Sequence, residues 1–382
     1  MKKVVHVFTV SMSVIFLEGL YDKLKSRGYE LIVICADGKE VRHLERVGNI
    51  KYYPVNISRG INPIKDLYAL IKIISILMKE KPEIVHGHTP KGGLLAVLAA
   101  KFLKINNRPY HLHGLKYTSE KGIRYIIIKW MEKMTISIST RVYAVSNGLK
   151  EFVISSELGS NTKIKVLLNG SVKGIDAKKS EEIRNNKEKL VDKLGIKKHE
   201  AIIGFIGRIT EEKGVFELFT AYKKLIENRY DVGLILCGPI EIRNVQNKNT
   251  FDEIIQLPGV QYFGQVNNPL EYMACCDIFV LPSWREGFGL VNIEANSVGV
   301  PVITTDIIGC KESIEDHKTG ILIERNNINA LFEALKFLVS NPELRRIMGQ
   351  NGIDRVKALY NRDKIWDELI DEYDRMTKVV EH

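Results

Sequence analysis

A segment with two glutamates, residues 277–295, holds the residue types and spacing best suited to chemistry. An apolar run typical of a buried strand ends at Pro282, a glycine-containing turn follows, and a helix is expected to begin near Gly289. Free backbone N–H groups and the positive end of the helix dipole then point toward the strand end, where an anion can bind. Glu286 and Glu294 are eight residues apart, which on a helix directs both carboxylates to one side of the site. Such carboxylates accept hydrogen bonds from hydroxyl groups, whereas the alternative is a capped helix with two solvated glutamates.

A second segment, residues 204–214, ends an apolar run in a loop that carries two cations. Arg208 can bind phosphate oxygens in bidentate fashion, and Lys213 supplies a point charge. Two cations and exposed amides at a strand end suit a diphosphate leaving group. A solvated loop with ordinary basic residues is the alternative if the segment is considered alone.

Short β-branched runs alternate with longer helical patterns in both halves of the chain, which is the signature of βαβ units around a parallel sheet. Helices are expected between the strands, for example at residues 15–27 and 92–103. The sequence therefore predicts an α/β protein with two parallel sheets. The expected strands are residues 4–10, 31–35, 84–86, 110–113, 142–145 and 165–168, and then 201–206, 232–237, 260–263, 278–281, 302–304 and 320–323.

A chain of 382 residues is longer than one hydrophobic core usually fills. The polar, lysine-rich residues 171–200 separate the two strand sets, so we expect an N-terminal domain at 1–171 and a C-terminal domain at 172–382. The last helical stretch, residues 342–379, has no strand to follow and is expected to pack across the surface or back onto the first domain. Two such facing domains would place a ligand in the cleft between them, at the carboxyl ends of the strands.

The charge of the chain is divided unevenly between its halves. The net charge is +10, but residues 1–170 hold 27 Lys and Arg against 13 Asp and Glu, whereas the remainder holds 29 against 33. The basic half is expected to face a polyanion, either nucleic acid or an anionic membrane. Five cysteines without metal-ligand spacing favour a reducing compartment, so a cytoplasmic location is expected.

The chain resembles glycosyltransferase family 4, the retaining enzymes of GT-B fold with two facing Rossmann-like domains. The resemblance rests on the Gly-Arg…Lys-Gly loop, the Glu-x7-Glu pair and the Asp-Ile-Phe-Val-Leu-Pro-Ser run before the glycine turn, and it extends over nearly the whole chain. It implies that the donor nucleotide sugar is bound by Gly207, Arg208, Lys213, Gly264, Val266, Glu286, Gly287, Phe288, Gly289, Leu290 and Glu294.

The first domain contributes histidine motifs to the same resemblance, at residues 84–93 and 110–114. The resemblance implies that His113 lies near the transferred sugar and that His86 or His88 lines the acceptor side. Many family members have a Gly-Gly loop after the first strand, where this chain has residues 9–13 with two serines. The implied catalytic residues are His113, Arg208, Lys213 and Glu286, and the implied acceptor-binding residues are Ser11, Ser13, His88 and Lys91.

The implied mechanism is metal-independent, because the chain has no Asp-x-Asp motif and Arg208 and Lys213 would neutralise the diphosphate. No cofactor is expected, and a UDP-linked N-acetylhexosamine or deoxy derivative is the expected donor. The expected acceptor is a saccharide on undecaprenyl diphosphate, in capsule or O-antigen synthesis.

Two front-half helices, residues 61–81 and 124–139, combine apolar and basic residues, which suits an anionic membrane surface. Peripheral association with the inner face of the plasma membrane is therefore expected, although packing of both helices on the sheet is the alternative. The rival functions are a nucleotide-sugar epimerase, a glucan-synthase-like polymerase, a sugar-binding module and a basic nucleic-acid-binding protein. The last lacks a recognisable nucleic-acid-binding motif, so nucleic acid is not an expected partner.

Overall fold

The computed structural model describes residues 1–58, 60–242 and 244–378, which form two compact units. Unit 1 comprises Met1–Lys173 together with the segment that begins at Asp363, and unit 2 comprises Gly174–Arg362. Unit 2 therefore ends at Arg362, and the last helix belongs to unit 1. Val379, the end of the expected C-terminal helical stretch, lies outside the described residues.

Unit 1 is built on a seven-stranded sheet in the order β3-β2-β1-β4-β5-β6-β7, and every pairing is parallel. The order reverses between β1 and β4, which makes the carboxyl ends of these two strands the switch point of the sheet. The strands are β1 (Lys2–Val7), β2 (Tyr29–Cys35), β3 (Lys51–Pro54), β4 (Ile84–His88), β5 (Tyr110–Leu112), β6 (Val142–Ala144) and β7 (Ile164–Val166).

Alternate residues of the unit 1 strands pack into two different cores. Val5 and Val7 belong to the core under α3 and α4, whereas Val4 and Phe8 belong to the core under α1, α2 and α16. The helices are η1 (Ser11–Leu17), α1 (Leu20–Ser26), α2 (Lys39–Gly48), α3 (Pro63–Glu80), α4 (Pro90–Phe102), η2 (Lys116–Ser119), α5 (Gly122–Ile138), α6 (Asn147–Ser155) and α16 (Arg362–Lys378).

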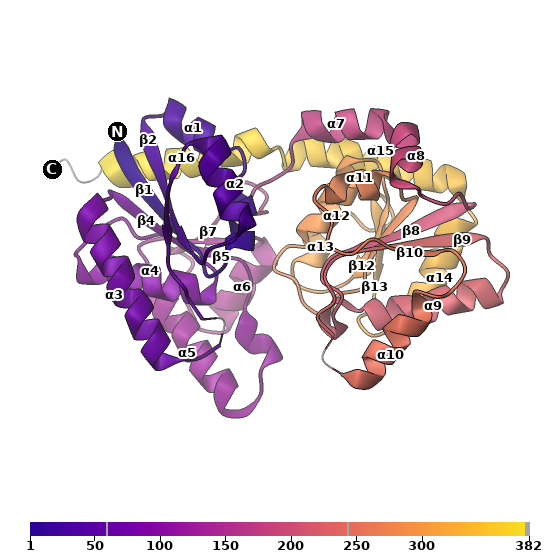
Figure 1. The fold of residues 1–382 in the computed structure, drawn as a ribbon, viewed down its shortest axis with the longest axis horizontal. Helices are drawn as coiled ribbons and strands as arrows, with labels where there is room; N and C mark the ends of the chain where they lie inside the picture. Colours follow the sequence, from indigo (N-terminus) through magenta and orange to yellow (C-terminus); the bar gives the residue numbers. More distant parts are fainter. Residues whose placement is uncertain (59, 243, 379–382) are drawn as a thin grey trace. The chain divides into compact units, whose positions relative to one another are not determined.

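Helix α16 comes from the end of the chain and lies along the elements that begin it (Figure 1). Its buried side chains Trp366, Ile370 and Tyr373 are part of the unit 1 core. Burying one such side chain contributes roughly 1.5–3 kcal/mol, so packing rather than surface charge holds the helix. Ion pairs lie on its polar face, such as that of Lys23 with Asp367 at 2.8 Å.

Unit 2 is built on a six-stranded parallel sheet in the order β10-β9-β8-β11-β12-β13, around a single buried core. Its strands are β8 (Ala201–Ile206), β9 (Val232–Cys237), β10 (Val260–Tyr262), β11 (Ile278–Leu281), β12 (Val302–Thr305) and β13 (Gly320–Ile323). Its helices are α7 (Ala177–Asn185), α8 (Lys187–Leu194), η3 (Glu211–Lys213), α9 (Val215–Glu227), α10 (Val245–Ile254), α11 (Pro269–Ala274), α12 (Leu290–Ser297), α13 (Cys310–Ser313), α14 (Ile328–Val339) and α15 (Pro342–Leu359).

The expected parallel α/β architecture is confirmed, with local differences. All six strands expected in unit 2 are present, but β3 was missed because this short edge strand is only partly buried. The helix expected at residues 15–27 is interrupted at Gly19, which has a φ of 78°. A left-handed residue cannot continue a right-handed helix, so η1 and α1 are separate elements.

Candidate functional site

Unit 2 brings the basic loop and the glutamate turn together at adjacent strand ends. The loop follows β8 and the turn follows β11, and these strands pair where the order of the sheet reverses. Open parallel sheets bind ligands at this switch point. Here the Lys213 ammonium pairs with the Glu286 carboxylate, and the two side chains are only 20% and 16% exposed. Two of the residues expected to be catalytic therefore lie in direct contact.

The backbone around Gly214 fixes this contact. Gly214 has a φ of +69°, and a Cβ atom there would lie 2.0 Å from the carbonyl oxygen of Pro282. The Trp284 N–H donates to the carbonyl oxygen of Glu212 at 2.9 Å. The loop that carries Lys213 is thus held against the residues that precede the glutamate turn.

A glycine contact also supports the turn itself. Gly309 has a φ of +87°, and a Cβ atom there would lie 2.5 Å from the carbonyl group of Gly287. Gly289, with a φ of +72°, directly precedes α12. Both positions favour glycine because L side chains rarely adopt this conformation and because the first has no room for one. Gly309, which the sequence analysis overlooked, is therefore part of the framework of the turn.

The two glutamates lie on different elements. Because α12 begins only at Leu290, Glu286 is in the turn and Glu294 is on the helix. The expectation that helical spacing aligns the two carboxylates is therefore wrong, and the turn sets the position of Glu286 instead. Phe288 is buried and meets the ring of Tyr360 edge-on at 5.3 Å, so its side chain serves packing.

Arg208 lies on the same loop as Lys213 but has a different partner. Its Nη1 atom donates to Glu241 Oε2 at 2.8 Å, and the two side chains are 47% and 38% exposed. An exposed ion pair of this kind contributes little to the stability of the fold. Glu241 carried no signal in the sequence that distinguished it from other surface glutamates.

Three glycines connect the ends of neighbouring strands beside this loop. Gly238 packs directly against Gly207, because a Cβ atom at position 238 would be 1.8 Å from the carbonyl oxygen of Gly207. Its N–H donates to the carbonyl oxygen of Gly264 at 2.7 Å. Gly207 and Gly264, both expected at the donor site, are therefore joined through Gly238, and the half-buried Val266 follows. Gly238 was missed, although it directly follows a predicted strand.

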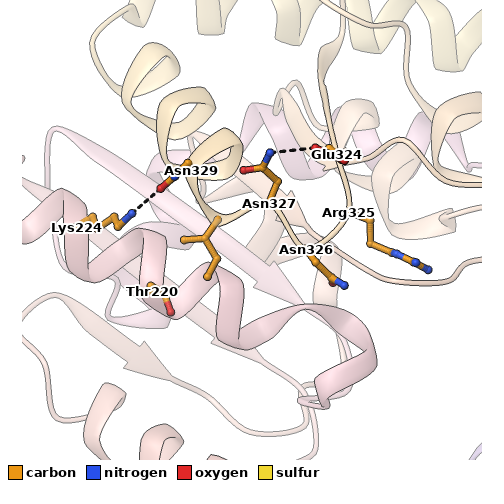
Figure 2. A pocket seen from close by; sticks show the side chains of 8 residues that line it. Thr220, Lys224, Glu324, Arg325, Asn326, Asn327 and Asn329 are labelled. Carbon is orange, nitrogen blue, oxygen red and sulfur yellow. Dashed lines mark hydrogen bonds between the residues drawn. The ribbon is translucent and has the colours of Figure 1, made fainter.

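Unit 2 also has a surface cavity of about 440 Å³, lined by Thr220, Lys224 and residues 324–329. Figure 2 shows two hydrogen bonds along its wall, from Lys224 to Asn329 and from Asn327 to Glu324. None of the lining residues belongs to the expected donor site, so this cavity is a separate surface feature.

In unit 1, the serine expected to replace a glycine loop has a structural partner. The Ser11 hydroxyl accepts a hydrogen bond from the N–H of Val41 at 3.0 Å and donates one to Glu40 at 2.8 Å. It therefore caps the first turn of α2. Ser13 is partly exposed, and its N–H donates to the carbonyl oxygen of Val10 at 3.2 Å.

Lys91 is likewise engaged within unit 1. Its ammonium lies 2.7 Å from a carboxylate oxygen of Asp66 and 2.7 Å from the hydroxyl of Ser58, and it also donates to the carbonyl oxygen of Gly60. The side chain is 9% exposed. Its charge is thus neutralised by Asp66, which the sequence analysis did not single out.

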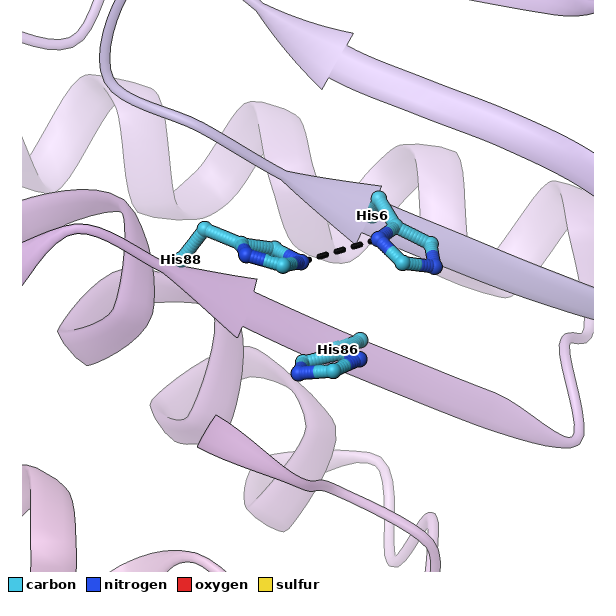
Figure 3. A group of neighbouring side chains, drawn as sticks. All are labelled: His6, His86 and His88. Atoms are coloured by element: carbon cyan, nitrogen blue, oxygen red, sulfur yellow. Dashed lines mark hydrogen bonds between the residues drawn. The ribbon is translucent and has the colours of Figure 1, made fainter. Parts of the chain in front are cut away.

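Five histidines lie on one face of the unit 1 sheet. His6 is on β1, His86 and His88 are on β4, His111 is on β5, and His113 follows β5. Figure 3 shows His6 hydrogen-bonded to His88, with His86 beside them. His113 is hydrogen-bonded to His88 at 3.1 Å, and its ring is stacked on Phe16 at 5.0 Å.

Burial keeps these imidazoles neutral. It lowers the pKa of His6 to about 3 and that of His113 to about 4. Burial, together with the neighbouring imidazoles, holds the pKa of His86, His88 and His111 well below the usual value. His88 is 2% exposed and both its nitrogens have protein partners, so it acts on a ligand only through His113.

His6, His86 and His88 also form a group whose ring nitrogens lie within 4.8 Å of one another, which is a spacing that a metal ion can bridge. Within this group, His6 Nδ1 and His88 Nε2 are joined by a hydrogen bond at 2.8 Å. The sequence signal for the whole face was present: histidines two apart, at 86 and 88 and at 111 and 113, point to the same side of a strand.

Comparison with known proteins decides the family. The family model described as Glycosyltransferase Family 4 matches residues 14–171, and the model described as Glycosyl transferases group 1 matches residues 186–355. The capsular polysaccharide biosynthesis glycosyltransferase CapM of Staphylococcus aureus is 33% identical over 99% of this chain and 98% of its own length. The chain belongs to glycosyltransferase family 4.

One further comparison agrees with the glycosyltransferase assignment, and another agrees with the fold. An Escherichia coli UDP-Gal:α-D-GlcNAc-diphosphoundecaprenol α-1,3-galactosyltransferase is 28% identical over 92% of this chain and 91% of its own length. Anabaena HepE, solved in complex with UDP and glucose, has a TM-score of 0.80 at 16% identity and covers 98% of this chain and 100% of its own. The family 4 glycosyltransferase has the GT-B fold, and it is an enzyme of the hexosyltransferase type.

Proposed function

We propose that this enzyme transfers a sugar from UDP to a saccharide carried on undecaprenyl diphosphate, with retention of anomeric configuration, during surface-polysaccharide synthesis. The observation that carries the proposal is the Lys213–Glu286 pair at the switch point of unit 2. The names of two relatives support the substrate classes, since one acts in capsule synthesis and the other transfers galactose from UDP to a diphosphoundecaprenol-linked sugar. We infer an N-acetylhexosamine or a deoxy derivative as the donor sugar.

The chemistry of the donor site follows from its charges. As the bond to the sugar breaks, negative charge grows on the diphosphate, and a fixed cation beside it stabilises the transition state. Lys213 supplies that cation, and Arg208 leaves its exposed partner Glu241 to supply a second. Released from Lys213, the Glu286 carboxylate accepts hydrogen bonds from the sugar hydroxyls, and Glu294 holds the ribose. With two fixed cations we propose that no metal ion is required.

On the acceptor side, burial and internal hydrogen bonds support a smaller set of candidate contacts. The polar atoms of Ser11, Lys91 and His88 have partners within unit 1. We therefore assign acceptor and sugar contacts to the partly exposed Ser13 and His113.

A membrane surface is the proposed location, because two helices of unit 1 expose apolar side chains among lysines. On α3, Ile64 is 83% exposed, and on α5, Trp130 is 61% exposed. Both helices contact α4, which lies between them (Figure 1). Lys65 and Lys129 lie on the same two helices, where their positive charges can pair with anionic lipid headgroups. Among the described residues, no helix is both long and apolar enough to cross a membrane.

Vesicle binding tests this location. Replacing Ile64 and Trp130 with serine should abolish cosedimentation with vesicles that contain phosphatidylglycerol, and vesicles of phosphatidylcholine alone should bind the wild type weakly. Phe337 and Ile347 are exposed apolar residues of unit 2, so their serine variants are the matched control and should bind normally. Equal binding by both pairs of variants would overturn the proposed membrane surface.

A transfer assay tests the function itself. The purified enzyme receives labelled UDP-sugars and a diphosphoundecaprenol-linked acceptor, and the anomeric configuration of the product is read by NMR. Lys213→Ala and Glu286→Gln should each lower kcat by about 10²-fold or more, as loss of a preorganised electrostatic contact does. Lys224→Ala, in the separate surface cavity, is the control and should retain full activity. Full activity in both site variants would refute the assignment, and an inverted product would refute retention.

The rival functions predict different experimental results. An epimerase would change the UDP-sugar without an acceptor, whereas the proposed transferase forms a lipid-linked product only when the acceptor is present. A nucleic-acid-binding protein would retain labelled RNA or DNA on a filter at moderate salt, which the proposed function does not predict.

A further inference from the structure

The histidine face of unit 1 is one continuous hydrogen-bonded chain. His113 Nε2 meets His88 Nδ1 at 3.1 Å, and His88 Nε2 meets His6 Nδ1 at 2.8 Å. His6 Nε2 meets the hydroxyl of Tyr373 at 3.1 Å, and this hydroxyl meets His86 Nδ1 at 2.5 Å. The chain runs from the partly exposed His113 to the fully buried His86.

The sheet and α16 create this arrangement. His6 pairs with His86 in the register of β1 and β4, and His88 pairs with His111 in the register of β4 and β5. These side chains lie on the face of the sheet that α16 covers, where Tyr373 inserts its hydroxyl between His6 and His86. Tyr373, from the last helix, therefore completes a hydrogen-bonded chain that includes His6 of the first strand.

Counting protons leaves two arrangements for the whole chain. A neutral imidazole carries a single N–H, and the buried hydroxyl of Tyr373 donates its one proton to either His6 or His86, so the direction of one hydrogen bond fixes all the others. In the inward arrangement, His113 donates from Nε2, and the last proton resides on His86 Nε2. In the outward arrangement, His86 donates from Nδ1 to Tyr373, and the last proton resides on His113 Nδ1.

The buried end of the chain selects between these two arrangements. His86 Nε2 is buried and is among the polar atoms that have no hydrogen-bond partner in the described part of the chain. The inward arrangement would leave a buried N–H without an acceptor, whereas the outward one leaves only an unused lone pair. Orphaned buried N–H groups are the rarer and costlier of the two.

We propose that His6, His86, His88 and Tyr373 are positioning residues that hold His113 as its Nδ1–H tautomer, so that His113 donates a hydrogen bond to a substrate oxygen. In this role His113 is a donor and not a base, because Nδ1 accepts a proton only if every hydrogen bond of the chain reverses. The catalytic consequence rests on the proposed function, but the tautomer itself does not.

Nitrogen NMR of the full-length protein labelled with ¹⁵N-histidine tests the tautomer directly, since protonated and unprotonated ring nitrogens differ widely in chemical shift. His113→Gln identifies the His113 signals by their loss. The wild type should show His113 protonated at Nδ1. Protonation at Nε2, or signals showing that His6, His86 and His88 ligate a metal ion, would overturn the proposal. This measurement needs no substrate and stands whether or not transfer is observed.

Tyr373→Phe tests the coupling, because it keeps the ring and removes the hydroxyl that joins His6 to His86. The His113 signals should shift to a mixture of tautomers, and kcat should fall about tenfold, as loss of one substrate hydrogen bond predicts, with KM for the donor unchanged. The control is Tyr143→Phe, which removes another buried hydroxyl on this face, bonded to Glu372 at 3.1 Å. The control should leave the His113 signals unchanged. Unchanged His113 signals in Tyr373→Phe would overturn the coupling between Tyr373 and His113. If that variant does not fold, the tautomer of His113 in the wild type still tests the proposal.

Discussion

Five neutral imidazoles, four of them buried and His113 partly exposed, should make unit 1 sensitive to mild acid. The pKa of His6 is lowered to about 3 and that of His113 to about 4, and the pKa of the other three lies well below the usual value. In the unfolded chain each imidazole has a pKa of about 6.5, so between pH 7 and pH 5.5 only the unfolded state takes up these protons. The stability that these groups contribute is therefore present above pH 6.5 and is lost as the pH falls through that value.

The magnitude follows from proton linkage. Each imidazole costs about 1.2 kcal/mol between pH 7 and pH 5.5, and five cost about 6 kcal/mol. Glu132 opposes this loss, because burial raises its pKa to about 7, and the folded state then gains about 1.6 kcal/mol from its protonation over the same interval. A net loss of about 4–5 kcal/mol is expected, which is a large fraction of the stability of a typical domain.

Urea unfolding at the two pH values measures this loss. Trp366 is buried in unit 1, so a variant with Trp130→Phe and Trp284→Phe, which retains it as the last of three tryptophans, reports on that unit by fluorescence. His111→Gln should reduce the pH effect by about 1.2 kcal/mol. A loss below about 1 kcal/mol in the variant that retains only Trp366 and all five histidines would refute the neutral state of the five imidazoles.

Two further substitutions test the packing of the sites. Gly214→Ala should destabilise unit 2 by about 2–4 kcal/mol in urea unfolding, because its Cβ would meet Pro282, whereas Gly195→Ala, with a similar φ and nothing within 4 Å, should cost only about 1–2 kcal/mol. Equal losses would show that the Pro282 contact is unimportant. Lys91→Met should destabilise unit 1 by about 3 kcal/mol because it leaves the Asp66 carboxylate without its cationic partner, and adding Asp66→Asn should restore part of the loss. A double variant no more stable than Lys91→Met would contradict that explanation.

The sequence predicted the sheets well because buried parallel strands leave a simple pattern. All six strands of unit 2 were recognisable as short apolar runs, whereas the half-exposed edge strand β3 has no such run. The glycine and charge motifs correctly indicated the loop of Lys213 and the turn of Glu286. These motifs are local, and adjacent strand ends bring them together.

The partners of the site residues could not be predicted, because they come from distant segments. Asp66 neutralises Lys91, and Tyr373 joins the histidine chain from 367 residues after His6. Helical spacing also gave a wrong prediction for the pair Glu286 and Glu294, because Glu286 lies before the start of α12. The partners of these site residues are distant in sequence and contact them only in the folded chain.

We propose that the switch point of unit 2 binds the UDP part of the donor by means of its fixed cations. Calorimetric titration of UDP into the wild type and into Lys213→Ala, each with EDTA present, measures the role of these cations. The wild type should bind UDP in EDTA, and Lys213→Ala should bind it at least about tenfold more weakly, as loss of a charged hydrogen bond implies. Binding that requires added Mg²⁺, or equal affinity in the two proteins, would refute a metal-free site based on Lys213.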